Sequence, residues 1–193
     1  MISGEKIVLR EKRPTDAAND YAWRCDPELA AFDAVPPLRT SFTEFAAGYE
    51  DTLRYPSWRR QRFAIDTAEG KHIGNCTFYD IDERRRQAEL GITIGDREYW
   101  GRGFGTDVVR TMLAWVFKTT ELDRIYLHTL EWNHRARRSF AKAGFAEMEM
   151  VRQDGHTFMK MEIRRERWRQ LNGNAADLSS ASAASPPLPV NGA

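Results

Sequence analysis

The chain has 193 residues, of which 41% are hydrophobic and 30% are charged, a balance typical of one globular domain with a sizeable core. The formal net charge of +1 excludes a global bias toward nucleic acid or an anionic membrane. Two cysteines, Cys25 and Cys76, are too few and too far apart for a disulfide framework or a metal knuckle. The N-terminus lacks the apolar region of a signal peptide, and no apolar run is long enough to span a bilayer. We therefore expect a cytoplasmic protein with no metal and no contact with a membrane.

The N-terminal half of the chain alternates between helical and strand-like hydrophobic patterns. The stretch Ser-Phe-Thr-Glu at 41–44 is a capping box that begins one helix, and Asp26-Pro27 ends or kinks an earlier one. A turn at 68–70 joins two strands into a hairpin. In chain order, the expected elements are a strand at 7–9, helices at 14–26 and 41–54, and strands at 63–67, 71–79 and 88–94.

The C-terminal half continues this mixture of helices and strands. Asn133 can cap a helix, and Gly144 stops the same helix. The expected elements are a helix at 106–118, a strand at 124–130, a helix at 133–143, and a hairpin of strands at 145–151 and 157–164. Beyond about residue 171 the chain is rich in Ala, Ser and Pro, which predicts a disordered tail at 172–193 after a single domain at 1–171. The element order predicts an α+β fold.

Three glycines alternate in the stretch 100-WGRGFGT-106, directly before an amphipathic helix. Glycine lets backbone N–H groups converge into a concave nest, and a helix N-terminus adds free N–H donors and a partial positive charge. Arg102 can add a charge-assisted contact to the same anion. The loop lacks the Lys of a Walker motif and the third Gly of a dinucleotide fingerprint. The sequence therefore predicts a phosphate site of another kind, with a glycine-rich turn that binds nothing as the alternative.

This loop resembles the acetyl-CoA pyrophosphate loop of the GNAT N-acetyltransferase superfamily, whose pattern is Gln/Arg-x-x-Gly-x-Gly/Ala. Downstream, 133-NHRARRSFAKAGF-145 resembles the second signature of that family, and one helix and one strand separate the two, as in the family. The stretch 88-AELGITIG-95 resembles its central splayed strand. The similarity covers residues 5–165, and it is closest in style to the branch with ribosomal-protein and polyamine acetyltransferases.

The resemblance implies a GNAT-like mixed, mostly antiparallel central sheet flanked by helices, with a splayed cleft for acetyl-CoA. It also implies an acyltransferase that moves an acetyl group from acetyl-CoA, as co-substrate, to a primary amine. The backbone of Ile92, Thr93 and Ile94 would pair with the pantetheine arm, and one of its N–H groups would polarise the acetyl carbonyl. The other cofactor-binding residues that it implies are Gly101, Arg102, Gly103, Phe104, Gly105, Thr106 and Asn133.

Two positions depart from the family pattern. Trp100 stands at the usual Gln/Arg position, whose side chain generally makes no phosphate bonds. Phe140 stands where many members have a tyrosine that protonates the leaving thiolate, and phenylalanine has no proton to donate. Three alternatives stay open: Ser139 is the acid, a water molecule is, or the free thiolate leaves, since a thiol of this kind has a pKa of about 8.5.

Glu89 is the leading candidate for the general base, because an amine acceptor is protonated at neutral pH and must lose a proton before it attacks. It lies three residues before Ile92 on the strand that should carry the acetyl group. Gly91 removes a side chain beside it, which should leave room for substrate or water. The alternative is a solvated carboxylate paired with Arg86. His128, at the middle of a strand, is expected to pack rather than to catalyse.

Other polar and aromatic residues could have either a structural role or a functional one. His72 and His156 are expected at the surface, whereas His134 could approach the cofactor. None of the four histidines has a metal-ligand spacing with another His or Cys. Three acids, Asp26, Glu28 and Asp33, are interpreted as helix-end and loop residues, although they could attract a cationic acceptor. The aromatic residues expected in the core by helical spacing are Trp23, Phe32, Phe42, Phe45 and Tyr49.

Three hypotheses for the function follow. The first is direct acetyl transfer to an amine in a ternary complex, because no cysteine lies near the motif to form an acyl-enzyme. The second is a catalytically impaired CoA-binding sensor or interaction module, which Phe140 favours. The third is nucleic-acid binding through arginine-rich runs, which the near-zero charge disfavours. The acceptor is a small-molecule amine or a protein N-terminus, and a homodimer is compatible with such a fold.

Overall fold

The computed structural model describes residues 1–57 and 59–181, and none of the helices in this part of the chain is long and apolar enough to cross a membrane. The last helix, α6, runs from Arg165 to Ala181, past the expected start of the tail at residue 172. The rest of that expected tail, 182–193, lies outside the described residues. The division into one domain and a disordered tail stays a prediction.

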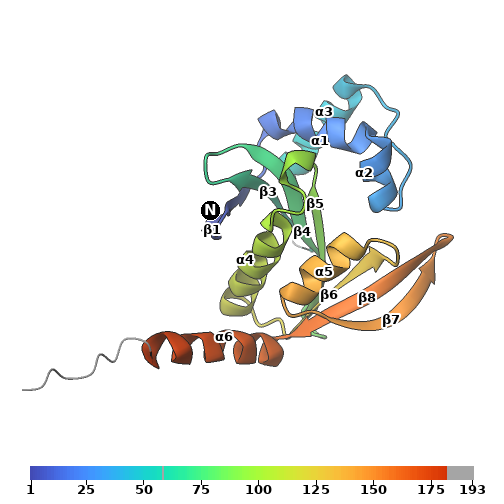
Figure 1. The fold of residues 1–193 in the computed structure, drawn as a ribbon. Coiled ribbons are helices and arrows are strands. Elements are labelled where there is room, and N and C mark those ends of the chain that lie inside the picture. Colours follow the sequence, from blue (N-terminus) through green and yellow to red (C-terminus); the bar gives the residue numbers. More distant parts are fainter. Residues whose placement is uncertain (58, 182–193) are drawn as a thin grey trace, which may run out of the picture.

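Eight strands form one mixed sheet in the order β1-β2-β3-β4-β5-β6-β8-β7 (Figure 1). Every neighbouring pair is antiparallel except β5 and β6, which run parallel. The fold is therefore the mixed, mostly antiparallel sheet expected from the sequence. The strands are β1 (Ile2–Ser3), β2 (Ile7–Glu11), β3 (Gln61–Thr67), β4 (His72–Asp82), β5 (Gln87–Ile94), β6 (Arg124–Leu130), β7 (Ala146–Gln153) and β8 (His156–Arg164).

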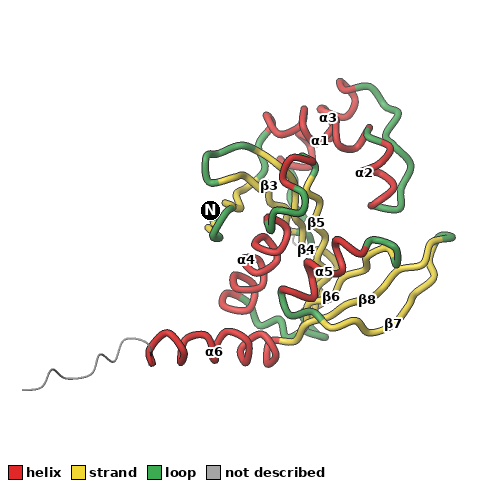
Figure 2. The backbone as a smooth tube through the Cα atoms, in the orientation of Figure 1, coloured by secondary structure: helices red, strands yellow, loops and turns green. Residues whose placement is uncertain are grey.

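The helices form separate groups around this sheet. Three of them, α1 (Ala17–Cys25), α2 (Pro27–Phe32) and α3 (Phe42–Arg54), lie together at one end of the molecule (Figure 2). Two others, α4 (Phe104–Thr119) and α5 (His134–Lys142), contact each other beside the middle of the sheet, and α6 projects from the end of β8. Short 3-10 turns at 14–16 and 97–99 precede α1 and the glycine loop.

The parallel pair β5 and β6 opens into a fork. The two strands pair at Gln87, Ala88 and Glu89, and the last matched pair is Glu89 with Tyr126. Beyond it β5 stays paired with β4 to Ile94, while β6 stays paired with β8 to Leu130. The sheet is thus continuous at one end and split at the other, so the splayed cleft expected from the sequence is confirmed.

The main core lies where α4 packs on the sheet. Its buried side chains recur at helical spacing, from Val108 and Val109 through Met112 and Leu113 to Val116. They contact buried residues of the strands on both sides of the fork, in one continuous cluster. Each such side chain contributes about 1.5–3 kcal/mol when it is fully buried. This packing fixes the N-terminus of α4 against the fork.

The expectations about the N-terminal helices are only partly confirmed. Asp26 ends α1 as expected, but it also begins α2, which was not expected, and there it accepts hydrogen bonds from the N–H groups of Glu28 and Leu29. The aromatic residues expected in the core are not among the buried ones: Phe42 is 45% exposed, and Trp23, Phe32, Phe45 and Tyr49 are half-buried. These aromatic residues belong to the outer layer of helices. Their helical spacing in the sequence is the same as that of residues that face a core.

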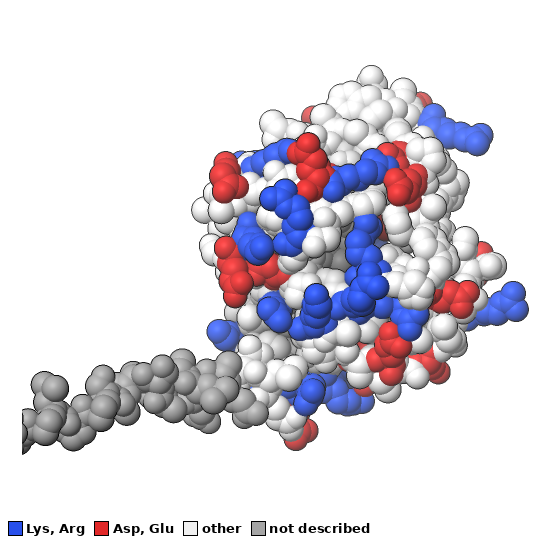
Figure 3. All heavy atoms as spheres, in the orientation of Figure 1, with Lys and Arg blue, Asp and Glu red and all other residues white. Residues whose placement is uncertain are grey.

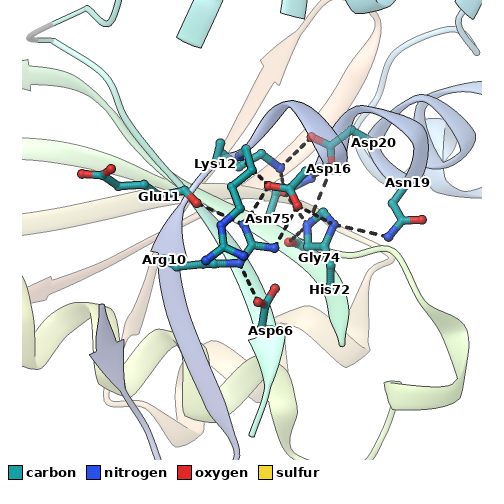
Figure 4. A network of polar contacts seen from close by, with 11 residues as sticks. Arg10, Glu11, Lys12, Asp16, Asn19, Asp20, Asp66, His72, Gly74 and Asn75 are labelled. Carbon is teal, nitrogen blue, oxygen red and sulfur yellow. Dashed lines mark hydrogen bonds and ion pairs between the residues drawn. The ribbon is translucent and has the colours of Figure 1, made fainter. Parts of the chain in front are cut away.

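A buried network of charges joins the start of α1 to the sheet (Figure 4). The Arg10 guanidinium donates two hydrogen bonds of 2.8 Å to Asp16 and one of 2.6 Å to Asp66. The Lys12 ammonium lies 2.6 Å from Asp20. His72 was expected at the surface, but its ring is only 7% exposed and lies within this network, so that expectation is wrong. The network fixes the helical layer on the open end of the sheet.

The Asp16 carboxylate predicts one pH effect on stability. Burial by itself raises its pKa, but hydrogen bonds from the Arg10 side chain and the Arg13 N–H outweigh this and lower the pKa below the usual range. Because the folded-state pKa is the lower one, the stabilisation is present above the unfolded value of about 4 and is lost as pH falls through the folded value. We expect Asp16→Asn to destabilise the protein at neutral pH and progressively less in acid, as measured by urea unfolding across pH. A destabilisation that is constant with pH would contradict this role.

Candidate active site

The fork between β5 and β6 opens into a cavity of about 900 Å³. Its walls come from the split ends of β4, β5 and β6, from the glycine loop with the first turn of α4, and from one face of α5. The end of α2 and the β7–β8 turn close its other side. Eight of the ten expected cofactor-binding residues are among the described residues that line it, and Arg102 and Phe104 are the two that are not.

The glycine loop has the backbone geometry of an anion site. Gly101 and Gly103 have φ angles of +71° and +88°, which side-chain-bearing residues rarely adopt. Gly103 is the N-cap of α4, which begins at Phe104 and not at Thr106 as expected. The first N–H groups of a helix have no partner within it, and those of α4 lie at the wall of the cavity. This cradle fits a pyrophosphate group.

The loop is anchored from behind by the N-terminal segment. The Asp107 carboxylate accepts hydrogen bonds from the N–H groups of Glu5 and Lys6, at 3.1 and 2.7 Å. The Lys6 ammonium donates to the carbonyl oxygen of Arg102, at 3.1 Å. The Arg102 guanidinium itself donates to the carbonyl oxygen of Glu98, at 3.1 Å, on the outside of the loop. These contacts hold the loop in place without using the groups that face the cavity.

One face of α5 adds cations to the same wall. Arg135, Arg138 and Lys142 line the cavity, and Lys and Arg side chains gather around a hollow in the region of α5 (Figure 3). Their spacing of three and four residues places them on one face of the helix. Residues 135–138 form one of the arginine-rich runs that were weighed for nucleic-acid binding, and their helical spacing with Lys142 is the sequence signal for this cationic face. These residues supply the charge that a ligand with several phosphates requires.

Two expected site residues lie where α5 begins and where it meets α4. The Asn133 side chain caps α5 by accepting a hydrogen bond from the N–H of Ala136, at 3.2 Å, and it also lines the cavity. The Ser139 hydroxyl lies 2.9 Å from the hydroxyl of Thr106, in the first turn of α4. Phe140 is buried and packs against Phe145. The structure thus places Ser139 at the glycine-loop end of the cavity.

Trp100 joins the glycine loop to the helices on both sides. Its ring N–H donates to the carbonyl oxygen of Ile94, at 2.6 Å, which ties the loop to the end of β5. The guanidinium carbon of Arg135 lies 3.5 Å from the centre of its ring, and Phe32 of α2 contacts the ring edge-on. A cation from α5 therefore lies at the position where the family pattern has Gln or Arg.

Glu89 and His128 meet at the point where the fork opens. Glu89 Oε1 lies 2.8 Å from His128 Nδ1, and both residues line the cavity. Tyr79 lies opposite Glu89 in the β4–β5 ladder. Gly91 lines the cavity, so its missing side chain leaves space there, although a Cβ would lie 3.2 Å from the Tyr79 ring. Glu89 is not paired with Arg86, which contacts Glu121 and Asp123 instead.

Three further carboxylates line the cavity: Asp33 of the α2 end, Asp80 of β4 and Asp154 of the β7–β8 turn. The Asp33 side chain faces solvent in the cavity, but the protein around it desolvates the carboxylate, which raises its pKa despite the nearby Arg24 and the Thr93 hydroxyl. In contrast, Asp26 and Glu28 contact Arg97 at 2.8 Å, as expected for helix-end acids without a role in the site. The carboxylates of the cavity, called its acidic end below, therefore come from several chain segments.

The remaining candidates have no part in this arrangement. Cys25 and Cys76 are free thiols, and neither is among the described residues that line the cavity. His134 is exposed and is likewise absent from the described lining, whereas His156 lies at the acidic end. Within residues 1–57 and 59–181, no three His, Cys, Asp or Glu side chains are grouped so as to hold a metal ion.

The fold and the site define a class of enzyme that binds a phosphorylated acyl donor beside a forked sheet. Residues 6–146 match the family model of the acetyltransferase (GNAT) domain. This match spans more than half of the chain, and the chain belongs to the GNAT acetyltransferase family. It is an acetyl-CoA-dependent acetyltransferase, as the two sequence signatures implied.

Several known proteins are similar to this chain. An uncharacterized N-acetyltransferase, p20, of Bacillus licheniformis is 28% identical over 127 residues, which are 63% of this chain and 68% of that protein. The spermidine N(1)-acetyltransferase of Vibrio cholerae serotype O1 is 31% identical over 87 residues, 45% of this chain and 50% of that protein. A solved spermidine N-acetyltransferase of Vibrio cholerae, in complex with CoA and spermine, has the same fold, with a TM-score of 0.74 and 22% identity over 84% of this chain and 97% of that chain.

Proposed function

We propose that the protein transfers the acetyl group of acetyl-CoA to a primary amine by direct attack within a ternary complex. The observation that carries this proposal is the lining of one cavity, which includes the glycine loop, the cations of α5 and three carboxylates that we take as the acceptor end. The fork of β5 and β6 opens into the same cavity. A donor with phosphates and a cationic acceptor can therefore meet at the fork.

The backbone of β5 supports a role in holding the donor. Past Glu89, the described residues pair β5 with β4 on one side only, so its free edge at 90–94 lines the cavity. N–H and C=O groups on this edge would pair with the amides of the pantetheine arm, and an N–H there would polarise the acetyl carbonyl. Ile92, Thr93 and Ile94 keep the roles expected from the sequence.

The position of the thiols supports direct transfer. An acyl-enzyme would need a nucleophile at the cavity, and neither cysteine is among its described lining residues. Burial also raises the pKa of Cys76, which keeps it a thiol. In the proposed reaction the amine loses a proton to a base and its nitrogen bonds to the acetyl carbon. The C–S bond then breaks, and CoA leaves with the electron pair as a thiolate.

The charge of the acceptor end favours a small amine with more than one positive charge. Asp33, Asp80 and Asp154 come from three different segments, so a single ammonium group would use only part of this end. One relative is named a spermidine acetyltransferase and another a putative ribosomal N-acetyltransferase, and structural neighbours include an aminoglycoside acetyltransferase. We infer a polyamine-like acceptor for this chain, with a protein N-terminus as the alternative.

Asp80→Asn tests this choice of acceptor. Asp80 has a φ of +49°, which Asn tolerates well, so the substitution removes a charge with little cost to the fold. Losing one charge contact near the surface costs about 1 kcal/mol, which is roughly a fivefold higher KM for a polyamine. A monoamine of equal length should be affected less, and added salt should reduce the difference. Equal effects on both amines, compared by steady-state kinetics, would count against a polycationic acceptor.

Ser139→Ala separates two roles for this hydroxyl. If Ser139 serves the phosphate end with Thr106, as its position favours, the KM for acetyl-CoA rises a few-fold and kcat is unchanged. If it is the acid that protonates the thiolate, kcat falls by roughly 10²-fold instead. We expect the first result, measured by initial rates at varied acetyl-CoA, and Thr106→Val should have the same effect.

The function as a whole is tested by calorimetric titration with acetyl-CoA, followed by an assay of thiol release with a panel of amines. We expect micromolar binding and turnover with polyamines. A folded protein that binds no acetyl-CoA would overturn the proposal. Binding without turnover for any amine would instead favour the CoA-binding sensor, the alternative that Phe140 suggested.

A further inference from the structure

The geometry points to His128 as the group that takes the proton from the amine, with Glu89 as the residue that positions its ring. This inference rests on the proposed amine acetylation and changes the role expected for Glu89 from base to positioning residue. It is carried by three observations on the pair: the hydrogen bond between the two side chains, the difference in their exposure, and their place at the opening of the fork.

The hydrogen bond fixes which ring nitrogen of His128 carries the proton. A carboxylate only accepts, so His128 Nδ1, at 2.8 Å from Glu89 Oε1, must be the donor. In the neutral ring the lone pair then lies on Nε2, which is the nitrogen that can accept a proton from an amine. The arrangement matches the acid–histidine pair of many hydrolases, in which the carboxylate holds the tautomer and stabilises the imidazolium.

Exposure and contacts favour His128 over Glu89 as the group that meets the amine. The Glu89 side chain is 11% exposed, whereas that of His128 is 26% exposed. Tyr79 lies opposite Glu89 in the β4–β5 ladder. Burial, and then the charge of Glu89, raises the pKa of the Tyr79 phenol, which therefore stays protonated. An amine would have to displace His128 to reach Glu89 Oε1, whereas Nε2 has no hydrogen-bond partner among the described residues.

The position of the pair agrees with this role. The ladder between β5 and β6 ends at Glu89 and Tyr126, and His128 follows two residues later on the same face of β6. It therefore lies just inside the fork, next to the free edge of β5 that is proposed to hold the acetyl group. Carboxylates of the acceptor end line the same cavity. A cationic amine drawn to that end meets His128 on its way to the fork.

Two protons leave the nitrogen, because an ammonium carries three hydrogens and the amide carries one. The ammonium gives the first proton to Nε2, and the imidazolium, ion-paired with Glu89, releases it to water. The neutral amine attacks the acetyl carbon, the C–S bond breaks, and the thiolate leaves with the electron pair. The nitrogen, which is cationic after the attack, gives its second proton to Nε2, and His128 passes this proton to the thiolate. An acid at the Phe140 position is not needed, because the thiolate receives this second proton.

Other charged groups around His128 bear on its pH dependence. Lys160 of β8 lies opposite it in the ladder, and its ammonium is paired with Glu149 of β7 at 2.9 Å. The Tyr126 ring contacts the imidazole edge-on, and burial raises the pKa of this phenol, which stays neutral. The charge nearest to the ring is therefore that of Glu89.

His128→Asn is the sharpest test. The Asn amide nitrogen can replace Nδ1 as donor to Glu89, so a purely structural role is preserved while the base is lost. We expect unchanged unfolding and acetyl-CoA binding, a loss of about 10²–10⁴-fold in kcat/KM for the amine, and loss of the rise in kcat/KM with pH. His134→Asn, the same change at an exposed histidine outside the described lining, is the matched control.

Two further measurements keep the inference falsifiable. Imidazole in solution should restore activity to His128→Gly in a concentration-dependent way, and nitrogen-15 NMR should find the proton of the neutral ring on Nδ1 in the wild type but not in Glu89→Gln. His128→Asn that keeps its activity and pH profile, while acetyl-CoA still binds, would overturn this inference alone. A wild type that neither binds acetyl-CoA nor acetylates any amine would overturn the proposed function as well.

Discussion

Replacing Gly103 with valine is expected to raise the Kd for acetyl-CoA at least about 100-fold, which is close to 2.7 kcal/mol of binding free energy. Gly103 has a φ of +88° and forms the N-cap of α4, so its conformation aims the N–H groups of the loop into the cavity. A β-branched residue strongly disfavours positive φ. The backbone would leave this conformation, and its N–H groups would no longer converge on the cavity. Calorimetric titration with acetyl-CoA measures the effect.

Gly70→Val is the matched control for this experiment. Gly70 has a φ of +87° in the β3–β4 hairpin turn, and a Cβ added there meets no atom of the described residues within 4 Å. Both variants should therefore lose about 1–2 kcal/mol of stability from the same backbone strain. Only the change at Gly103 should weaken acetyl-CoA binding. If both variants bind as the wild type does, the loop is a glycine-rich turn and not the phosphate site.

Arg10→Met is expected to destabilise the protein by about 3–5 kcal/mol, because it leaves two carboxylates buried without their cation. The Arg10 side chain is 7% exposed, and its partners Asp16 and Asp66 are 4% and 10% exposed. For a chain of this size, the loss corresponds to a fall in Tm of roughly 6–20 °C. Urea unfolding and calorimetry measure the two quantities.

An exposed arginine with two carboxylate partners provides the control. Arg97 is 45% exposed and contacts Asp26 and Glu28, each at 2.8 Å. Because water screens such pairs, Arg97→Met should cost only about 0–1 kcal/mol. Similar losses of unfolding free energy in the two variants would mean that burial does not determine how much the Arg10 network stabilises the protein. The comparison is informative because both arginines hold two acids and differ mainly in burial.

Local patterns were enough for most of the fold. The Ser41 capping box, the Asn133 cap and the turn before Lys71 are short-range features, and each lies where it was expected. α2 was missed because Pro27 stops one helix and begins the next, two roles that look alike in sequence. β1 is two residues long, and pairing with β2 forms it, which no local pattern reveals.

Local patterns likewise predicted one part of the candidate site and missed another. The glycine loop and α5 were found because the residues of each are close together in the chain, and Gly101 and Gly103 have the positive φ that glycine allows. The pairing of Glu89 with His128 could not be predicted from a local pattern, because the two residues are 39 positions apart in the chain. Strand register places their side chains together, and a strand histidine has no sequence feature that distinguishes packing from proton transfer.

The sequence by itself predicted a phosphate-binding loop, because backbone geometry at glycines and helix ends is encoded within a few neighbouring residues, and the resemblance of its two signatures implied the family and the donor. Only the tertiary structure decided what lies around the acetyl group. The acids of the acceptor end come from α2, β4 and the β7–β8 turn, and Arg135 reaches Trp100 from another element. Such groups meet through strand pairing and helix packing, where contact depends on the whole fold and not on distance along the chain.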